Sequence, residues 1–120
     1  MKTVRPGGAL PSDAGYLYHA TNLENARDIT EDGFLLTHRP EYGTDQDVWP
    51  DGSRQKRSYF SARADAVWCF APVHGEPVIL RIARSAADFK RESTGDFYAT
   101  TKIAAKHVEI LTDDGWEPLA

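Results

Sequence analysis

The sequence has a single cysteine, no long apolar run and no excess of basic residues, and each of these absences excludes a class of protein. Cys69 stands alone, so no disulfide can form within the chain, which fits a reducing compartment. No stretch approaches the roughly 18 apolar residues of a membrane-spanning helix. Residues 1–8 lack the apolar run of a signal peptide. We therefore expect a cytoplasmic protein with no membrane partner.

The charge balance argues against a general nucleic-acid binder. The chain carries 18 acidic and 14 basic residues, for a formal net charge of −4. An acidic surface of this kind has no general attraction for phosphate groups. One short basic cluster consists of Arg54, Lys56 and Arg57, and short charge runs are usually solvated loops.

The signatures of phosphate-binding loops, zinc sites and serine hydrolases are also missing. There is no P-loop, no G-x-G-x-x-G motif and no G-x-S-x-G elbow. The four histidines are scattered along the chain, and one cysteine does not complete a zinc site with them. We expect no bound metal, so any chemistry must rest on a different set of side chains.

The patterns that are present predict one α+β domain. A chain of 120 residues with 41% apolar and 27% charged residues fits a single globular domain. Residues 1–14 contain several prolines and glycines, which predict an irregular leader before a domain of residues 15–120. Aromatic and β-branched runs predict five or six short strands, with candidates at residues 16–19, 58–61, 78–82, 97–101 and 107–112.

Two short helices complete the predicted fold. The first follows a capping box at Thr21, whose hydroxyl would accept a hydrogen bond from the Glu24 amide, and it ends at Gly33. The second covers residues 62–70. Long loops predicted at residues 37–57 and 90–96 would flank any cleft, and a loop as long as the first is usually functional in a compact domain.

The segment around His19 has the most characteristic pattern. The run Leu17-Tyr18-His19-Ala20-Thr21, followed by Asn25-Ala26, Ile29 and Gly33-Phe34, resembles the first motif of ADP-ribosyltransferases of the poly(ADP-ribose) polymerase type. Two later segments resemble the second and third motifs: Tyr59-Phe60-Ser61 with Ala66-Val67-Trp68-Cys69, and Asp96-Phe97-Tyr98-Ala99 with Ile103. The three motifs together bracket residues 16–112, nearly the whole chain.

This resemblance implies a split β-sheet that clamps NAD, the ADP-ribose donor, in an open cleft. His19 would hydrogen-bond a ribose hydroxyl of NAD. The Ala20 backbone would hold the nicotinamide carboxamide, with support from Thr21. Tyr59 and Trp68 would stack on the two faces of the nicotinamide ring, a contact that suits flat aromatic groups.

The same resemblance places Ser61 at the base of the pocket and a carboxylate beside the reacting carbon. Loss of nicotinamide leaves an oxocarbenium-like ribose, so the site should place negative charge near that carbon. The family uses a glutamate, whereas this sequence has Asp96, which is one methylene shorter. Moving a carboxylate by about 1 Å can cost on the order of 100-fold in rate, so Glu92 and Glu109 remain alternative acids.

The expected activity is transfer of ADP-ribose from NAD to a protein, nucleic-acid or small-molecule acceptor, with release of nicotinamide. The small size would suit a toxin, an effector or a phage-borne modifier. One alternative is a module that binds NAD or ADP-ribose without turnover. Another is an RNA 2′-phosphotransferase of the same fold, for which the basic candidates are Arg54, Lys56, Arg57 and Arg81.

Overall fold

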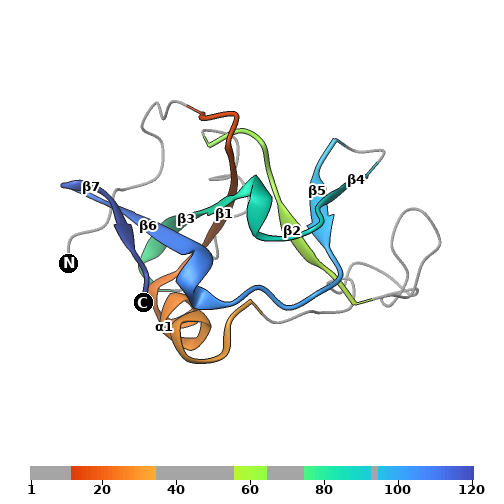
Figure 1. The fold of residues 1–120 in the computed structure, drawn as a ribbon. Helices are drawn as coiled ribbons and strands as arrows, with labels where there is room; N and C mark the ends of the chain where they lie inside the picture. The colour runs from red at the N-terminus through yellow and green to blue at the C-terminus, as the bar shows by residue number, and fades with distance from the viewer. Residues whose placement is uncertain (1–11, 35–55, 65–74, 93–94) are drawn as a thin grey trace.

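Two antiparallel β-sheets and one α-helix make up the described part of the chain (Figure 1). The structure is a computed structural model, and it describes residues 12–34, 56–64, 75–92 and 95–120. Trp68, Arg54 and most of the second predicted helix lie outside these residues. The described residues confirm the α+β class, and they contain no helix long and apolar enough to cross a membrane.

The larger sheet has four strands in the order β1-β3-β6-β7. They are β1 (Tyr16–Asn22), β3 (Pro77–Ala83), β6 (Val108–Thr112) and β7 (Gly115–Pro118). The apolar β3 run is the centre of the sheet because it pairs with β1 on one side and with β6 on the other. Val78, Leu80 and Ile82 point to one face and are fully buried, as expected for alternate positions of a strand.

The smaller sheet has three strands in the order β2-β5-β4, which are β2 (Ser58–Phe60), β5 (Phe97–Ala99) and β4 (Lys90–Arg91). The prediction of an unstructured polar loop at residues 90–96 is wrong at Lys90–Arg91, which pairs with β5. The Glu92 amide donates to the Asp96 carbonyl at 2.8 Å, and Gly95 takes a positive φ of 95° in the turn. Hairpin pairing therefore forms the strand Lys90–Arg91 without any apolar pattern in it.

The described strands number seven, more than the five or six expected. The two additional strands are β4 and β7, which lie in segments that the sequence pattern predicts as a loop and a chain end. Both form by pairing with a preceding or following strand across a short turn, and β7 pairs with β6 from Glu109 to Thr112. Such strands depend on their partner and carry little signal of their own.

Helix α1 (Leu23–Asp32) follows β1 directly. Its N-cap is Asn22, whose side-chain oxygen accepts a hydrogen bond from the Asn25 amide at 2.8 Å. The prediction of Thr21 as the cap is wrong because Thr21 is still paired with Val78 in the sheet and is buried there. The predicted end at Gly33 is confirmed: its φ is 75° and its amide donates to the Ile29 carbonyl.

The larger of two buried clusters among the described residues lies between the two sheets and the helix. Its members come from both sheets and from α1, and they include Leu17, Ile29, Phe60, Leu80 and Ala99. The helix lies beneath the strands in Figure 1, and Ala26 and Ile29 are its buried residues. Two short 3₁₀ turns, Arg84–Ala86 and Ala105–His107, connect strands at the edges of this core.

Candidate active site

The two sheets touch where β1 passes the residue that follows β2. Tyr18 and Ser61 exchange both backbone hydrogen bonds, at 2.7 and 2.8 Å. If antiparallel pairing continued from this bridge, the next hydrogen-bonded pair would be Ala20 and Tyr59. That pair does not form, because the structure has only the single bridge between these strands in its described residues. The sheet is therefore split beyond Tyr18.

The His19 side chain lies at the split. Its Nδ1 atom is 2.8 Å from the Tyr59 carbonyl oxygen, so an imidazole occupies the position that a backbone donor would take in a continuous sheet. A carbonyl oxygen only accepts, so Nδ1 must carry the proton. The other ring nitrogen, Nε2, is then a hydrogen-bond acceptor. The ring also packs against Phe34 and Phe60, with centroids 5.2 and 5.6 Å apart.

Partial burial favours the neutral form of the His19 imidazole. Desolvation lowers the pKa of His19 below its usual value of 6.5, and the hydrogen bond to the Tyr59 carbonyl opposes that shift only in part. A neutral ring with a fixed tautomer can accept a hydrogen bond from a ligand hydroxyl, which a doubly protonated ring does not do.

The Ala20 backbone faces the same split. Amide and carbonyl groups of a strand point alternately to its two neighbours. Those of Tyr18 bond Ser61, so those of Ala20, two residues later, point to the same edge, away from β3. No hydrogen bond joins them to a described residue on that side. As far as the described residues go, one donor and one acceptor therefore point into the opening between β1 and β2.

The Tyr59 side chain lies on the face of the small sheet that is turned away from Phe60 and the core. Arg57 is two residues earlier on the same face, and its Nη1 donates to the Tyr59 hydroxyl at 3.1 Å. The Tyr98 ring is 5.9 Å from the Tyr59 ring across the strand pair. Burial and a hydrogen bond with the Glu92 side chain raise the pKa of Tyr59, so the phenol stays protonated.

Two carboxylates accompany Tyr59. Glu92 is 7% exposed, and its amide donates to the Asp96 carbonyl, so both residues belong to the turn of the β4–β5 hairpin. By alternation, both side chains are on the Tyr59 face. Burial, and then the nearby negative charge of Glu92, raise the pKa of Asp96 above 3.8. The structure thus brings Tyr59, Glu92 and Asp96 together.

The His19 ring does not share this face. It packs on the core side with Phe60, whereas the Tyr59 phenol points the other way. What joins His19 to Tyr59 is the bond to the Tyr59 backbone at the split. The candidate site therefore has two parts, the His19–Ala20 edge of β1 and the Tyr59–carboxylate face of the small sheet, which meet at β2.

The other predicted residues are accounted for as follows. Thr21 is 4% exposed beside Ala20, and Ser61 forms the bridge to Tyr18. The predicted stacking partner Trp68 lies outside the described residues. Glu109 is on β6 of the large sheet, where its carboxylate accepts from Arg81 Nε at 2.9 Å, and it does not join the other acids.

Sequence reasoning named Arg57 only as a basic candidate and missed its contacts with Tyr59 and Tyr98. The expectation of a solvated basic loop is wrong for this side chain, which is 2% exposed and lies over the Tyr98 ring at 4.0 Å. A signal was available, because an arginine two residues before a strand tyrosine shares its face. The cation–π contact to Tyr98 joins segments far apart in the sequence and gave no local signal.

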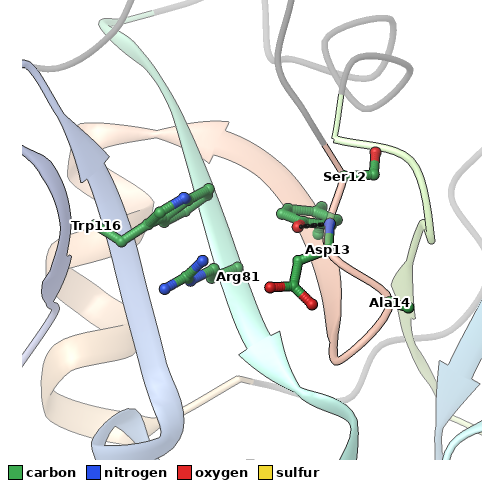
Figure 2. Close-up of a pocket in the computed structure, with 6 residues that line it drawn as sticks. Ser12, Asp13, Ala14, Arg81 and Trp116 are labelled. Carbon is green, nitrogen blue, oxygen red and sulfur yellow. Dashed lines mark hydrogen bonds between the residues drawn. The ribbon is translucent and has the colours of Figure 1, made fainter.

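A separate open cavity of about 480 Å³ lies on the large sheet (Figure 2). Its lining comes from the segment before β1 and from three strands: Ser12, Asp13, Ala14, Tyr18, Arg81 and Trp116. The Arg81 guanidinium lies over the Tyr16 and Trp116 rings, at 3.9 and 4.5 Å. This cavity contains neither His19 nor the carboxylates near Tyr59.

Among the described residues, no group of three or more histidine, cysteine, aspartate and glutamate side chains is placed to hold a metal ion. No family model, curated protein or solved structure matches this chain.

Proposed function

We propose that this protein is an ADP-ribosyltransferase with the split-sheet fold of that superfamily, and that it transfers ADP-ribose from NAD with release of nicotinamide. The observation that carries the proposal is the opening between β1 and β2. There, the amide and carbonyl of Ala20, which bond no described residue on that side, lie beside His19 and across from Tyr59. A carboxamide has one acceptor and two donors, so it complements that backbone edge.

The tautomer of His19 supports a role in ribose binding. With Nδ1 donating to the Tyr59 carbonyl, Nε2 of the neutral ring is the acceptor that a ribose hydroxyl would use. The bond also fixes the ring before any ligand arrives, and a pre-positioned acceptor lowers the entropic cost of holding the substrate.

The carboxylates near Tyr59 supply what the bond cleavage requires. As the bond between ribose C1′ and nicotinamide breaks, its electron pair leaves with nicotinamide and positive charge develops on the ribose. A carboxylate in a partly dry site stabilises that charge. The acceptor nucleophile then bonds to C1′, and its proton passes to a carboxylate or to water. Asp96 is the less buried acid of the pair and is our candidate for contact with the ribose.

A binding module without turnover is the second candidate, and one observation favours it. Asp96 has a raised pKa and is shorter than the family's glutamate, so its negative charge is less available at the reacting carbon. The RNA 2′-phosphotransferase alternative has less support. Arg57 is engaged with Tyr59 and Tyr98, and Arg81 is paired with Glu109 on the other sheet.

Two measurements on the purified chain separate these candidates: thermal stabilisation by NAD and the rate of nicotinamide release. A transferase stabilised by NAD will also release nicotinamide at a rate above the no-enzyme background. A binding module will show NAD-dependent thermal stabilisation with no release. His19→Ala and Tyr59→Ala should weaken NAD binding, whereas Asn25→Ala, on the exposed side of α1, is the matched control. NAD binding that is unchanged in His19→Ala removes the assignment of the site.

A further inference from the structure

We infer that the open cavity on the large sheet binds a guanine base, held between the Arg81 guanidinium and the Asp13 carboxylate (Figure 2). The inference is independent of the proposed transfer from NAD, because the described residues that line the cavity do not include His19, Tyr59 or Asp96. The cavity volume of about 480 Å³ lies within the range of about 300–1,000 Å³ that is usual for small-molecule sites.

The Arg81 side chain is held in place at one side of the cavity. Its guanidinium lies over the Tyr16 and Trp116 rings, at 3.9 and 4.5 Å, and its Nε donates to the Glu109 carboxylate at 2.9 Å. The side chain is 16% exposed, and its two Nη groups donate to no residue in the described part of the chain. The edge that carries these two nitrogens therefore suits a ligand with two adjacent acceptors.

The Asp13 carboxylate supplies acceptors on the facing side. The Asp13 amide donates to the Tyr18 hydroxyl and the Gly15 amide donates to Asp13 Oδ1, both at 2.8 Å, whereas Oδ2 bonds no described residue. Figure 2 shows the carboxylate turned toward Arg81, but no ion pair joins the two groups. A ligand with acceptors on one edge and donors on another would bridge the gap between these opposite charges.

The remaining lining favours a flat aromatic ligand over a phosphate group. The Tyr18 and Trp116 rings, with centroids 5.9 Å apart, form an aromatic wall beside the charged groups, and such rings stack on flat heterocycles. One positive and two negative side chains, Arg81, Asp13 and Glu109, give this place no net attraction for phosphate. The cavity therefore suits a base.

Guanine is the nucleobase whose edges match the two charged groups. Its O6 and N7 atoms are adjacent acceptors, which an arginine binds in a bidentate way. Its N1–H and 2-amino groups are adjacent donors, which pair with the two oxygens of a carboxylate. Adenine has an amino donor beside N7, so it would turn that donor toward Arg81.

Titration of the full chain with guanosine and three analogues, without NAD, tests the inference on the unaltered protein. Binding is followed by the NMR resonance of the Trp116 indole N–H, which is assigned by its absence in Trp116→Leu. Guanosine should shift this resonance. Because 7-deazaguanosine lacks the N7 acceptor and inosine lacks the 2-amino donor, each should bind at least about fivefold more weakly, and adenosine should bind weakest.

Two substitutions locate the contacts with the base. Asp13→Ala should bind guanosine and inosine equally, because the carboxylate that distinguishes them is gone. Arg81→Lys lacks the planar fork, so it should lose the preference for guanosine over 7-deazaguanosine. Asp88→Ala removes an exposed carboxylate outside the cavity and should keep both preferences.

Three outcomes overturn the inference. They are no shift with guanosine, equal affinity of the parent for guanosine and inosine, and a preference for guanosine over inosine that survives Asp13→Ala. A free amino acid, whose carboxylate and ammonium group also match the two charges, is the rival ligand, and a shift with glycine but not with guanosine assigns the cavity to that class. A thymine oligonucleotide with one guanine, compared with guanosine monophosphate, distinguishes a base within a nucleic acid from a free nucleotide. Absent nicotinamide release contradicts only the transferase, because these titrations contain no NAD.

Discussion

The His19 imidazole substitutes for a backbone donor at the point where the sheet divides. The His19 side chain donates to the Tyr59 carbonyl in place of a backbone amide of β1. This bond satisfies the carbonyl while β1 and β2 stay apart at that point. The neutral state of His19 is part of this arrangement, because desolvation disfavours the charged ring.

The charge state of His19 predicts a pH effect on stability. Its pKa is lowered in the folded chain, so between 6.5 and the folded value the unfolded chain binds more protons. The stability contributed by neutral His19 is therefore present above pH 6.5 and is lost as the pH falls below it. Chemical denaturation of the parent and of His19→Gln at pH 7.5 and 5 checks this. The parent should lose more stability on acidification than the variant, and an equal loss in both contradicts the assignment.

Local sequence patterns predicted some residues of the candidate site, such as His19 and Tyr59. They did not predict the interactions among these residues. The aromatic-His strand and the Tyr-Phe-Ser strand are local patterns, and the structure joins them at His19 and Tyr59. The burial of Glu92 and Arg57 depends on partners in other strands, and isolated charged residues usually indicate solvent exposure. The sequence therefore offered both residues as candidates, and it did not predict that they are buried beside Tyr59.

The strands and the helix end that were predicted correctly are those with a pattern in their own stretch of sequence. An aromatic run predicted β1 and a β-branched apolar run predicted β3, and Gly33 predicted the end of α1. The β4–β5 hairpin was missed because its stability comes from pairing, and the helix cap was misplaced by one residue because β1 continues to Asn22.

Asn22→Ala tests the start of α1. Loss of the side-chain oxygen leaves the Asn25 amide without its partner, so the free energy of unfolding should fall by about 1 kcal/mol. Asn25→Ala keeps that amide and removes an exposed side chain, so it should change stability by less than about 0.5 kcal/mol. Urea denaturation of both variants measures the difference. Equal effects contradict Asn22 as the cap.

Gly33→Ala tests the end of α1. Gly33 has a φ of 75°, and a Cβ there would come within 2.6 Å of the Ile103 carbonyl oxygen. Backbone strain of this kind costs about 1–3 kcal/mol, and the clash adds to it. Gly115 has a φ of 104° with nothing near its Cβ position, so Gly115→Ala carries the strain without the clash. Thermal unfolding should show a larger loss for Gly33→Ala, and the reverse order contradicts the described contact.

At the scale of the whole molecule, the two described sheets share one buried cluster. The large sheet contributes Leu17, Leu80 and Ile82 to the same cluster as Phe60 and Ala99 of the small sheet. The split between β1 and β2 lies beside this shared cluster. The two strands can therefore be apart at the candidate site while both sheets still pack on the same buried residues.

A shared core predicts one cooperative unfolding transition. Ile82→Val, in the large sheet, should lower the free energy of unfolding by about 1 kcal/mol, and Phe60→Leu, in the small sheet, should lower the midpoint of the same transition. Circular dichroism in the far and near ultraviolet should report coincident curves for both variants. Separate transitions, one moved by each substitution, would show that the sheets fold independently.

The proposed transfer from NAD is tested most directly by the initial rate of nicotinamide release from saturating NAD. The measurement compares the parent with Asp96→Asn and with Asp88→Asn, a control in which an exposed carboxylate outside the site is removed. We predict release by the parent and by Asp88→Asn at equal rates, and a loss on the order of 100-fold in Asp96→Asn. No release by the parent above the no-enzyme background, or equal release by all three proteins, would contradict the proposal.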